Sequence, residues 1–140
     1  LRADALHNLG RIDDAFDEYA ILSSNLRTRE GAKAKYQMVQ IMKGRGDLDR
    51  AQEEVFDFAQ SNTSHQYWLA KSFILLAEIY AERDDFFQAK ATLQSVIDGY
   101  DQTDDGVLEL ASDKLFDLVS EEKERQRAED VDTIRIEWSF

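Results

Sequence analysis

Apolar residues recur every three or four positions along most of the chain, which is the spacing of one face of an α-helix. Between residues 34 and 42 they fall at Ala34, Met38, Ile41 and Met42. Between residues 68 and 80 they are denser, so we expect that helix to lie between neighbouring helices. The pattern predicts seven helices, near residues 1–9, 12–24, 30–44, 48–60, 66–82, 86–99 and 106–128.

Polar residues and glycines mark the ends of these segments. Asp47, Asp84 and Asp85 precede apolar runs, where a carboxylate can accept hydrogen bonds from free backbone N–H groups and favour the helix dipole. All six glycines lie at or beside a predicted helix end, where a positive φ angle is accessible to glycine. With short connections and no strand expected in the first 130 residues, the predicted fold class is all-α.

The last ten residues change period. Ile134, Ile136 and Trp138 alternate with Arg135 and Glu137, which is typical of a strand or an extended segment. We therefore expect a short acidic-to-extended C-terminal tail over residues 129–140 that folds back and buries Trp138 on the helices. The alternative is that this segment adds as a strand to another chain.

Three stretches of the chain carry one pattern. Each begins with a turn residue, followed by an apolar residue two positions on, an alanine five positions on and an apolar residue nine positions on. The alanines Ala15, Ala51 and Ala89 are 36 and 38 residues apart. A period of this length with two helices in each unit indicates an α-solenoid.

Here the chain resembles the tetratricopeptide repeat family, over about residues 1–100. In the unit that fits best, the residues that carry the resemblance are Phe73, Leu76, Ala77 and Tyr80 in the first helix and Phe86, Ala89 and Leu93 in the second. The preceding unit departs from the family pattern, because Lys35 replaces a bulky residue and Val39 a small one. Thr63 stands where the family usually has a proline after the second helix.

The resemblance implies a domain of about three helix pairs over residues 1–128. The expected units are about 1–27, 30–63 and 66–102, followed by a capping helix over 106–128 whose inner face holds Val107, Leu108, Leu110, Ala111, Leu115, Phe116, Leu118 and Val119. In the first unit, the aligned first helix would begin about five residues before Leu1. We therefore expect this chain to be the C-terminal piece of a longer repeat protein.

Composition narrows the classes of function. The chain has no cysteine, which excludes a disulfide scaffold, a thiolate zinc site and a cysteine nucleophile. Its formal net charge is −12 with no basic stripe, which disfavours nucleic acid as a partner. The longest purely apolar run is five residues, against roughly 20 for a membrane-spanning helix, so we expect no direct membrane insertion by this segment.

Candidate chemistry is sparse. The only histidines, His7 and His65, fall in different units, too few for most metal sites or catalytic triads. Gly44 and Gly46 flank a helix–helix turn and do not form a phosphate-binding loop. We therefore predict no catalytic, metal-binding or cofactor-binding residues and no enzymatic activity.

The resemblance assigns a binding surface instead, because in the family the first helices of successive units line a concave groove. The matching positions here are Lys33, Tyr36, Gln40, Lys43, Lys71, Ile74, Glu78 and Glu82. Tyr36 and Ile74 are expected to form an apolar strip flanked by lysines. Tyr36 and Gln40 stand where some family members hold a chaperone's C-terminal carboxylate, so that partner is disfavoured.

The predicted function is a non-catalytic scaffold that binds a peptide or a partner helix in this groove. The alternative is a structural or self-associating repeat module of a larger cell-envelope assembly protein. Analogy with family members that have slightly long units favours a bacterial cell-envelope, periplasmic location, with the cytoplasm left open.

Overall fold

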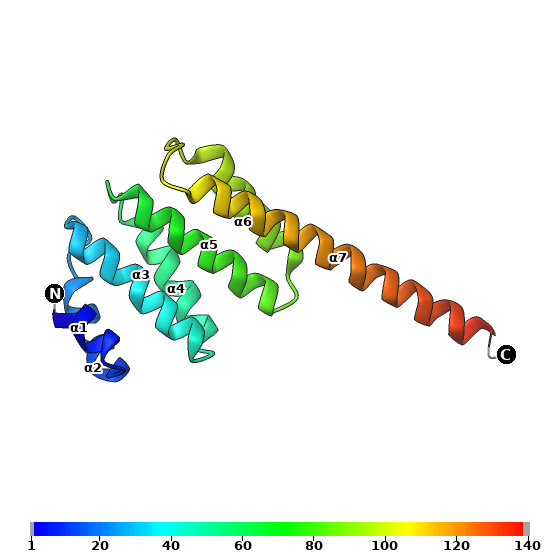
Figure 1. The fold of residues 1–140 in the computed structure, drawn as a ribbon, viewed down its shortest axis with the longest axis horizontal. Helices are drawn as coiled ribbons and strands as arrows, with labels where there is room; N and C mark the ends of the chain where they lie inside the picture. The colour runs from blue at the N-terminus through cyan, green and yellow to red at the C-terminus, as the bar shows by residue number, and fades with distance from the viewer. Residues whose placement is uncertain (1, 139–140) are drawn as a thin grey trace.

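A computed structural model describes the backbone of residues 2–138 and the side-chain burial of residues 2–131. It contains seven helices in that range and no strand (Figure 1): α1 (Arg2–Asn8), α2 (Ile12–Leu22), α3 (Arg29–Gly44), α4 (Leu48–Gln60), α5 (Gln66–Glu82), α6 (Phe86–Gly99) and α7 (Val107–Trp138). The all-α prediction is confirmed. The first six helices begin and end within two residues of the predicted positions.

The helices form a two-layered solenoid. Each helix packs against the next one along the chain, and in addition α3 packs against α5 and α5 against α7. These three helices lie side by side in Figure 1. The helix α4 contacts both α3 and α5, and α6 contacts both α5 and α7, so each second helix lies across two first helices.

The turns inside the three helix pairs share one backbone geometry. Gly10, Gly46 and Asp84 each have a positive φ angle, of 77°, 77° and 61°. In each turn the N–H of this residue donates to the carbonyl three residues back at 3.0 Å, and the next N–H donates to the carbonyl five residues back at 2.9 Å. This is the Schellman arrangement that ends a helix. The sequence repeat is therefore a repeat of backbone structure.

Two apolar clusters hold the solenoid together. The first lies among α1 to α5 and includes Tyr19, Met42 and Val55, and the second lies among α5, α6 and α7 and includes Leu93 and Val107. The half-buried side chains of Phe73 and Tyr80 on α5 pack against both clusters. The repeated alanines Ala15, Ala51 and Ala89 are fully buried, because each second helix approaches its neighbours most closely there.

Lys35 is a buried residue of α3. It stands at a position where the family that the chain resembles has a bulky apolar residue. Its Nζ atom binds Asp57 Oδ2 of α4 at 2.8 Å and also contacts the Glu54 carboxylate. Burial disfavours the charged lysine, but the hydrogen bonds and charges of Asp57 and Glu54 outweigh it, so the pKa of Lys35 lies above its ordinary value. The aliphatic stem fills the core while the ammonium reaches the rim.

The expected extended tail is wrong for residues 129–138, because α7 continues without a break to Trp138. No glycine or proline interrupts residues 107–138, and the run from Glu121 to Asp130 consists mostly of strong helix formers. A helix already nucleated at residue 107 extends through such a run at little cost. In Figure 1 the last turns of α7 project well past the other helices. The side chain of Trp138, which was expected to be buried, lies outside the described side chains. Residues 139–140 lie outside the described residues.

The buried side of α7 is narrower than predicted. Val107, Ala111 and Leu118 are buried, and Leu108, Leu115 and Val119 are half-buried. Two residues expected inside are exposed, namely Leu110 at 36% and Phe116 at 72%. At 100° per residue, Phe116 points away from Ala111 and Leu118. Within the part of the chain that the structure describes, α7 contacts α5 and α6 and no other helix, so no described helix covers its far side.

Candidate binding face

The sides of α3, α5 and α7 that carry Lys33, Tyr36, Lys43, Lys71, Glu78 and Lys114 form one continuous face, because side chains of neighbouring helices contact each other along it. We call this surface the α3–α5–α7 face. It contains seven of the eight residues predicted to line a groove. Five are half-buried, Lys33, Tyr36, Lys43, Lys71 and Glu78, and two are exposed, Gln40 and Glu82. The face therefore brings together side chains from helices that are nearly 40 residues apart in the sequence.

Ile74, the eighth residue, is only 2% exposed. It packs in the second apolar cluster with Ala111 and Val107 of α7. The expected apolar strip of Tyr36 and Ile74 is therefore wrong, because α7 lies against α5 and covers Ile74.

Tyr36 packs instead against Trp68, the first residue of the dense apolar run between residues 68 and 80. The ring centroids of Tyr36 and Trp68 are 5.5 Å apart, and Trp68 meets Tyr67 edge-to-face at 4.9 Å. We call Tyr36, Tyr67 and Trp68 the aromatic cluster. All three rings are partly exposed. The sequence offered one signal, since Trp68 and Lys71 are three positions apart and so share one side of α5.

Two lysines lie over these rings. Lys71 Nζ is 5.3 Å from the centroid of Tyr36 and 5.7 Å from that of Tyr67. Lys33 Nζ is 5.9 Å from the Trp68 ring and 3.4 Å from Asp4 Oδ2 of α1. Such ammonium-on-ring contacts are attractive and hold both partners in place. Among the residues that the structure describes, no carboxylate forms an ion pair with Lys71.

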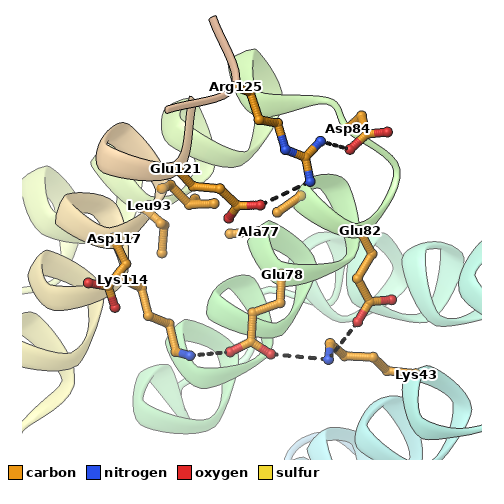
Figure 2. Close-up of a pocket in the computed structure, with 12 residues that line it drawn as sticks. Lys43, Ala77, Glu78, Glu82, Asp84, Leu93, Lys114, Asp117, Glu121 and Arg125 are labelled. Carbon is orange, nitrogen blue, oxygen red and sulfur yellow. Dashed lines mark hydrogen bonds and ion pairs between the residues drawn. The ribbon is translucent and has the colours of Figure 1, made fainter. Parts of the chain in front are cut away.

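The other end of the face is joined by ion pairs (Figure 2). The carboxylate of Glu78 on α5 lies 3.3 Å from Lys43 Nζ of α3 and 2.5 Å from Lys114 Nζ of α7, and Lys43 also binds Glu82 at 3.0 Å. Burial opposes the charge of Lys43, but these carboxylates outweigh it and raise its pKa. Glu78 therefore links all three helices of the face.

Beside this ion-pair chain lies a cleft of about 400 Å³ between α5, α6 and α7. Ala77 and Leu93 line it together with charged side chains, among them Asp117 and Glu121. Arg125 binds Glu121, one turn earlier on α7, at 3.0 Å and also contacts Asp84 in the turn between α5 and α6. Among the described residues, no group of three His, Asp or Glu side chains is arranged to hold a metal ion.

Comparison with known families decides the assignment. A family model described as a tetratricopeptide repeat-like domain matches residues 23–132, which is 110 of the 140 residues. The chain belongs to this family. Searches of the curated proteins and of the solved structures found no match.

The matched span of this tetratricopeptide repeat-like domain contains the whole α3–α5–α7 face as defined above, the aromatic cluster and the ion-pair chain. The helices α1 and α2 precede it, and the similarity of that first pair rests on the shared turn geometry. Membership gives the kind of molecule: a helical-repeat protein-interaction module from a family whose domains are generally not enzymes.

The two histidines of the chain, one before and one within the matched span, have structural contacts. His7 lies edge-on to Tyr19 with ring centroids 6.0 Å apart, and His65 Nε2 is 2.8 Å from the carbonyl of Arg27. Near His65, the hydroxyl of Thr63 donates to the carbonyl of Leu26 at 3.1 Å. Thr63, at the position of the family's proline, thus ties the end of the second pair to the loop before α3.

No described helix is both long and apolar enough to span a bilayer.

Proposed function

We propose that this domain is a non-catalytic scaffold that binds an extended peptide or a partner helix on the α3–α5–α7 face. The observation that carries the proposal is the aromatic cluster. Three large rings from two helices meet at the surface, and each keeps part of its area in contact with solvent. Tyrosine and tryptophan at such positions are the residue types that contribute most to protein–protein binding.

The cluster is also held in place before any partner arrives. Trp68 contacts Tyr36 and Tyr67, and the ammonium groups of Lys33 and Lys71 lie over the rings. Rings that are already fixed lose little conformational entropy when a partner covers them. This arrangement favours binding of a partner side chain against the rings.

The test compares two pairs of substitutions in affinity capture from a lysate of the source organism. Tyr36→Ala with Trp68→Ala removes two of the three rings of the aromatic cluster. Phe87→Ala with Phe116→Ala removes two exposed rings that lie off the face. We expect the first pair to lose the partners that the wild type captures and the second pair to keep them. Equal capture by the wild type and the first pair would rule out binding on this face.

A second candidate is a structural or self-associating module of a cell-envelope assembly. The exposure of Phe87 on α6, at 77%, and of Phe116 on the far side of α7 favours it, because a further helical unit could pack there. In the same experiment, loss of capture only with the Phe87 and Phe116 substitutions would support this candidate. Fractionation of source cells tests the accompanying expectation of a bacterial envelope location.

A further inference from the structure

Lys71 differs from the other lysines of the α3–α5–α7 face. Lys33, Lys43 and Lys114 each lie within 3.4 Å of a carboxylate oxygen. Lys71 has two ring faces as its contacts and, among the described residues, no ion pair. Lys35, which is buried, and Lys90, which is half-buried, also bind carboxylates, so among the described residues Lys71 is the exception among lysines that are not exposed.

Each ring of the aromatic cluster already has the ammonium group of a lysine over it. Lys71 lies over Tyr36 and Tyr67, and Lys33 lies over Trp68. A cationic ligand would have to displace these lysines and would meet their repulsion. The ammonium of Lys71 has three N–H donors, and ring faces are weak acceptors for them. The group that would complete the contacts of the Lys71 ammonium is therefore an anion, and we call it the missing group.

Lys33 shows how the missing group would be held. It lies over Trp68 and at the same time has Asp4 Oδ2 at 3.4 Å. The carboxylate of Asp4 also accepts a hydrogen bond from the Tyr19 hydroxyl at 2.9 Å. Lys33 thus has both a ring contact and a carboxylate within the chain, whereas Lys71 has contacts of the first kind alone, with the rings of Tyr36 and Tyr67.

We infer that the bound segment places an Asp or Glu side chain on Lys71 and an adjacent apolar side chain on Tyr36 and Trp68. The inference rests on the proposed function and specifies the partner's chemistry as an acidic segment with apolar residues. Charge complementarity selects this occupant, because Lys71 provides a positive charge that no described carboxylate neutralises. Ring area beside it remains available to an apolar side chain.

The test uses fluorescently labelled octapeptides with blocked ends in three matched series. The acidic series contains Glu beside Leu or Phe, and the other two replace each Glu with Gln or with Lys. We expect the acidic series to bind about tenfold more tightly than the Gln series, the effect of one charged hydrogen bond. The affinity of the acidic series is expected to fall as salt rises.

Variants locate the contact. Lys71→Glu is expected to weaken binding of the acidic peptides at least about tenfold, and Lys71→Arg to retain it, since both native and variant side chains carry the charge. Lys123→Glu is the matched control, because Lys123 is exposed on α7 outside the face. Circular dichroism melting curves establish that each variant is folded.

Several outcomes would overturn the inference. Equal binding of the Glu and Gln series would show that Lys71 does not bind a carboxylate of the partner. The proposed function would still stand in that case if Tyr36→Ala with Trp68→Ala abolished capture. The Gln series is also prepared with a free C-terminus, and binding of these peptides while the blocked acidic series fails to bind would assign Lys71 to a main-chain carboxylate. Self-association in sedimentation experiments that Lys71→Glu abolishes would assign it to an acidic helix of a second copy of this chain.

Discussion

Gly31 lies against the backbone carbonyl of Asn25, so close that an added β-carbon would be 1.9 Å from the carbonyl oxygen. Gly31 is in the first turn of α3, and Asn25 is in the loop that follows α2. The glycine is therefore required by a close approach of two backbone segments. The sequence placed it correctly at a helix end but suggested a positive φ angle as the reason, which holds for Gly10, Gly46 and Gly106.

Gly31→Ala is expected to destabilise the protein by about 3 kcal/mol, because backbone must move to admit the methyl group. Gly44→Ala is the matched control, since a β-carbon there meets nothing within 4 Å. It is expected to stabilise α3 by about 0.5 kcal/mol through helix propensity. Urea unfolding measures both, and a Gly31→Ala midpoint equal to that of the wild type would contradict the close approach.

Replacing Lys35 tests whether its ion pairs or its buried stem stabilise the α3–α4 contact. Lys35→Ala is expected to cost about 2 kcal/mol, mostly through lost packing, since Asp57 is largely exposed. Lys35→Leu is expected to stay within about 1 kcal/mol of the wild type, because a bulky apolar residue suits this position. Similar losses in both variants would show that the ion pairs dominate.

The Lys35 variants also differ in alkaline solution. The pKa of Lys35 is raised in the folded state, so its ionic contribution is fully present below the pKa of the unfolded lysine and is lost as pH rises through the folded pKa. The free energy of unfolding of the wild type should therefore fall above about pH 10.4 more steeply than that of Lys35→Leu. Parallel pH profiles for the two proteins would contradict this assignment.

Asp4 and Tyr19 predict a pH dependence in acid. Burial raises the pKa of the Asp4 carboxyl, but the hydrogen bond from Tyr19 and the charge of Lys33 outweigh it, so the net shift is downward. The stabilisation is present above the unfolded pKa of Asp4 and is lost as pH falls through the folded pKa. Tyr19→Phe should cost about 1 kcal/mol at neutral pH. Its cost should shrink as pH falls below the unfolded pKa of an aspartate, about 3.9; a pH-independent cost would exclude the hydrogen bond as its source.

The elements that were predicted correctly depend on local signals. The spacing of Ala15, Ala51 and Ala89 and the turn residues before them lie within single helix pairs, and each pair folds according to its own periodicity. The helix ends were predicted correctly for the same reason. The tail over residues 129–138 failed because alternation over five residues competes poorly with continuation of a helix already formed.

Side-chain positions on the face could be predicted only in part, because they depend on where a neighbouring helix lies. Ile74 and Tyr36 occupy matching places in α5 and α3, but α7 covers Ile74 while Tyr36 meets Trp68. Nothing local distinguishes the two positions. Because Phe116 is apolar, the sequence pattern predicted it on the inner face of α7. It lies instead on the side that no described helix covers.

The most direct test of the central claim, that a protein partner binds the α3–α5–α7 face, is the indole N–H resonance of Trp68 during titration with a captured partner. The resonance is assigned by its absence from the spectrum of Trp68→Phe. We predict that it shifts in step with binding, because the partner covers the aromatic cluster. Saturation of the protein by the partner with the Trp68 resonance unmoved would contradict the claim.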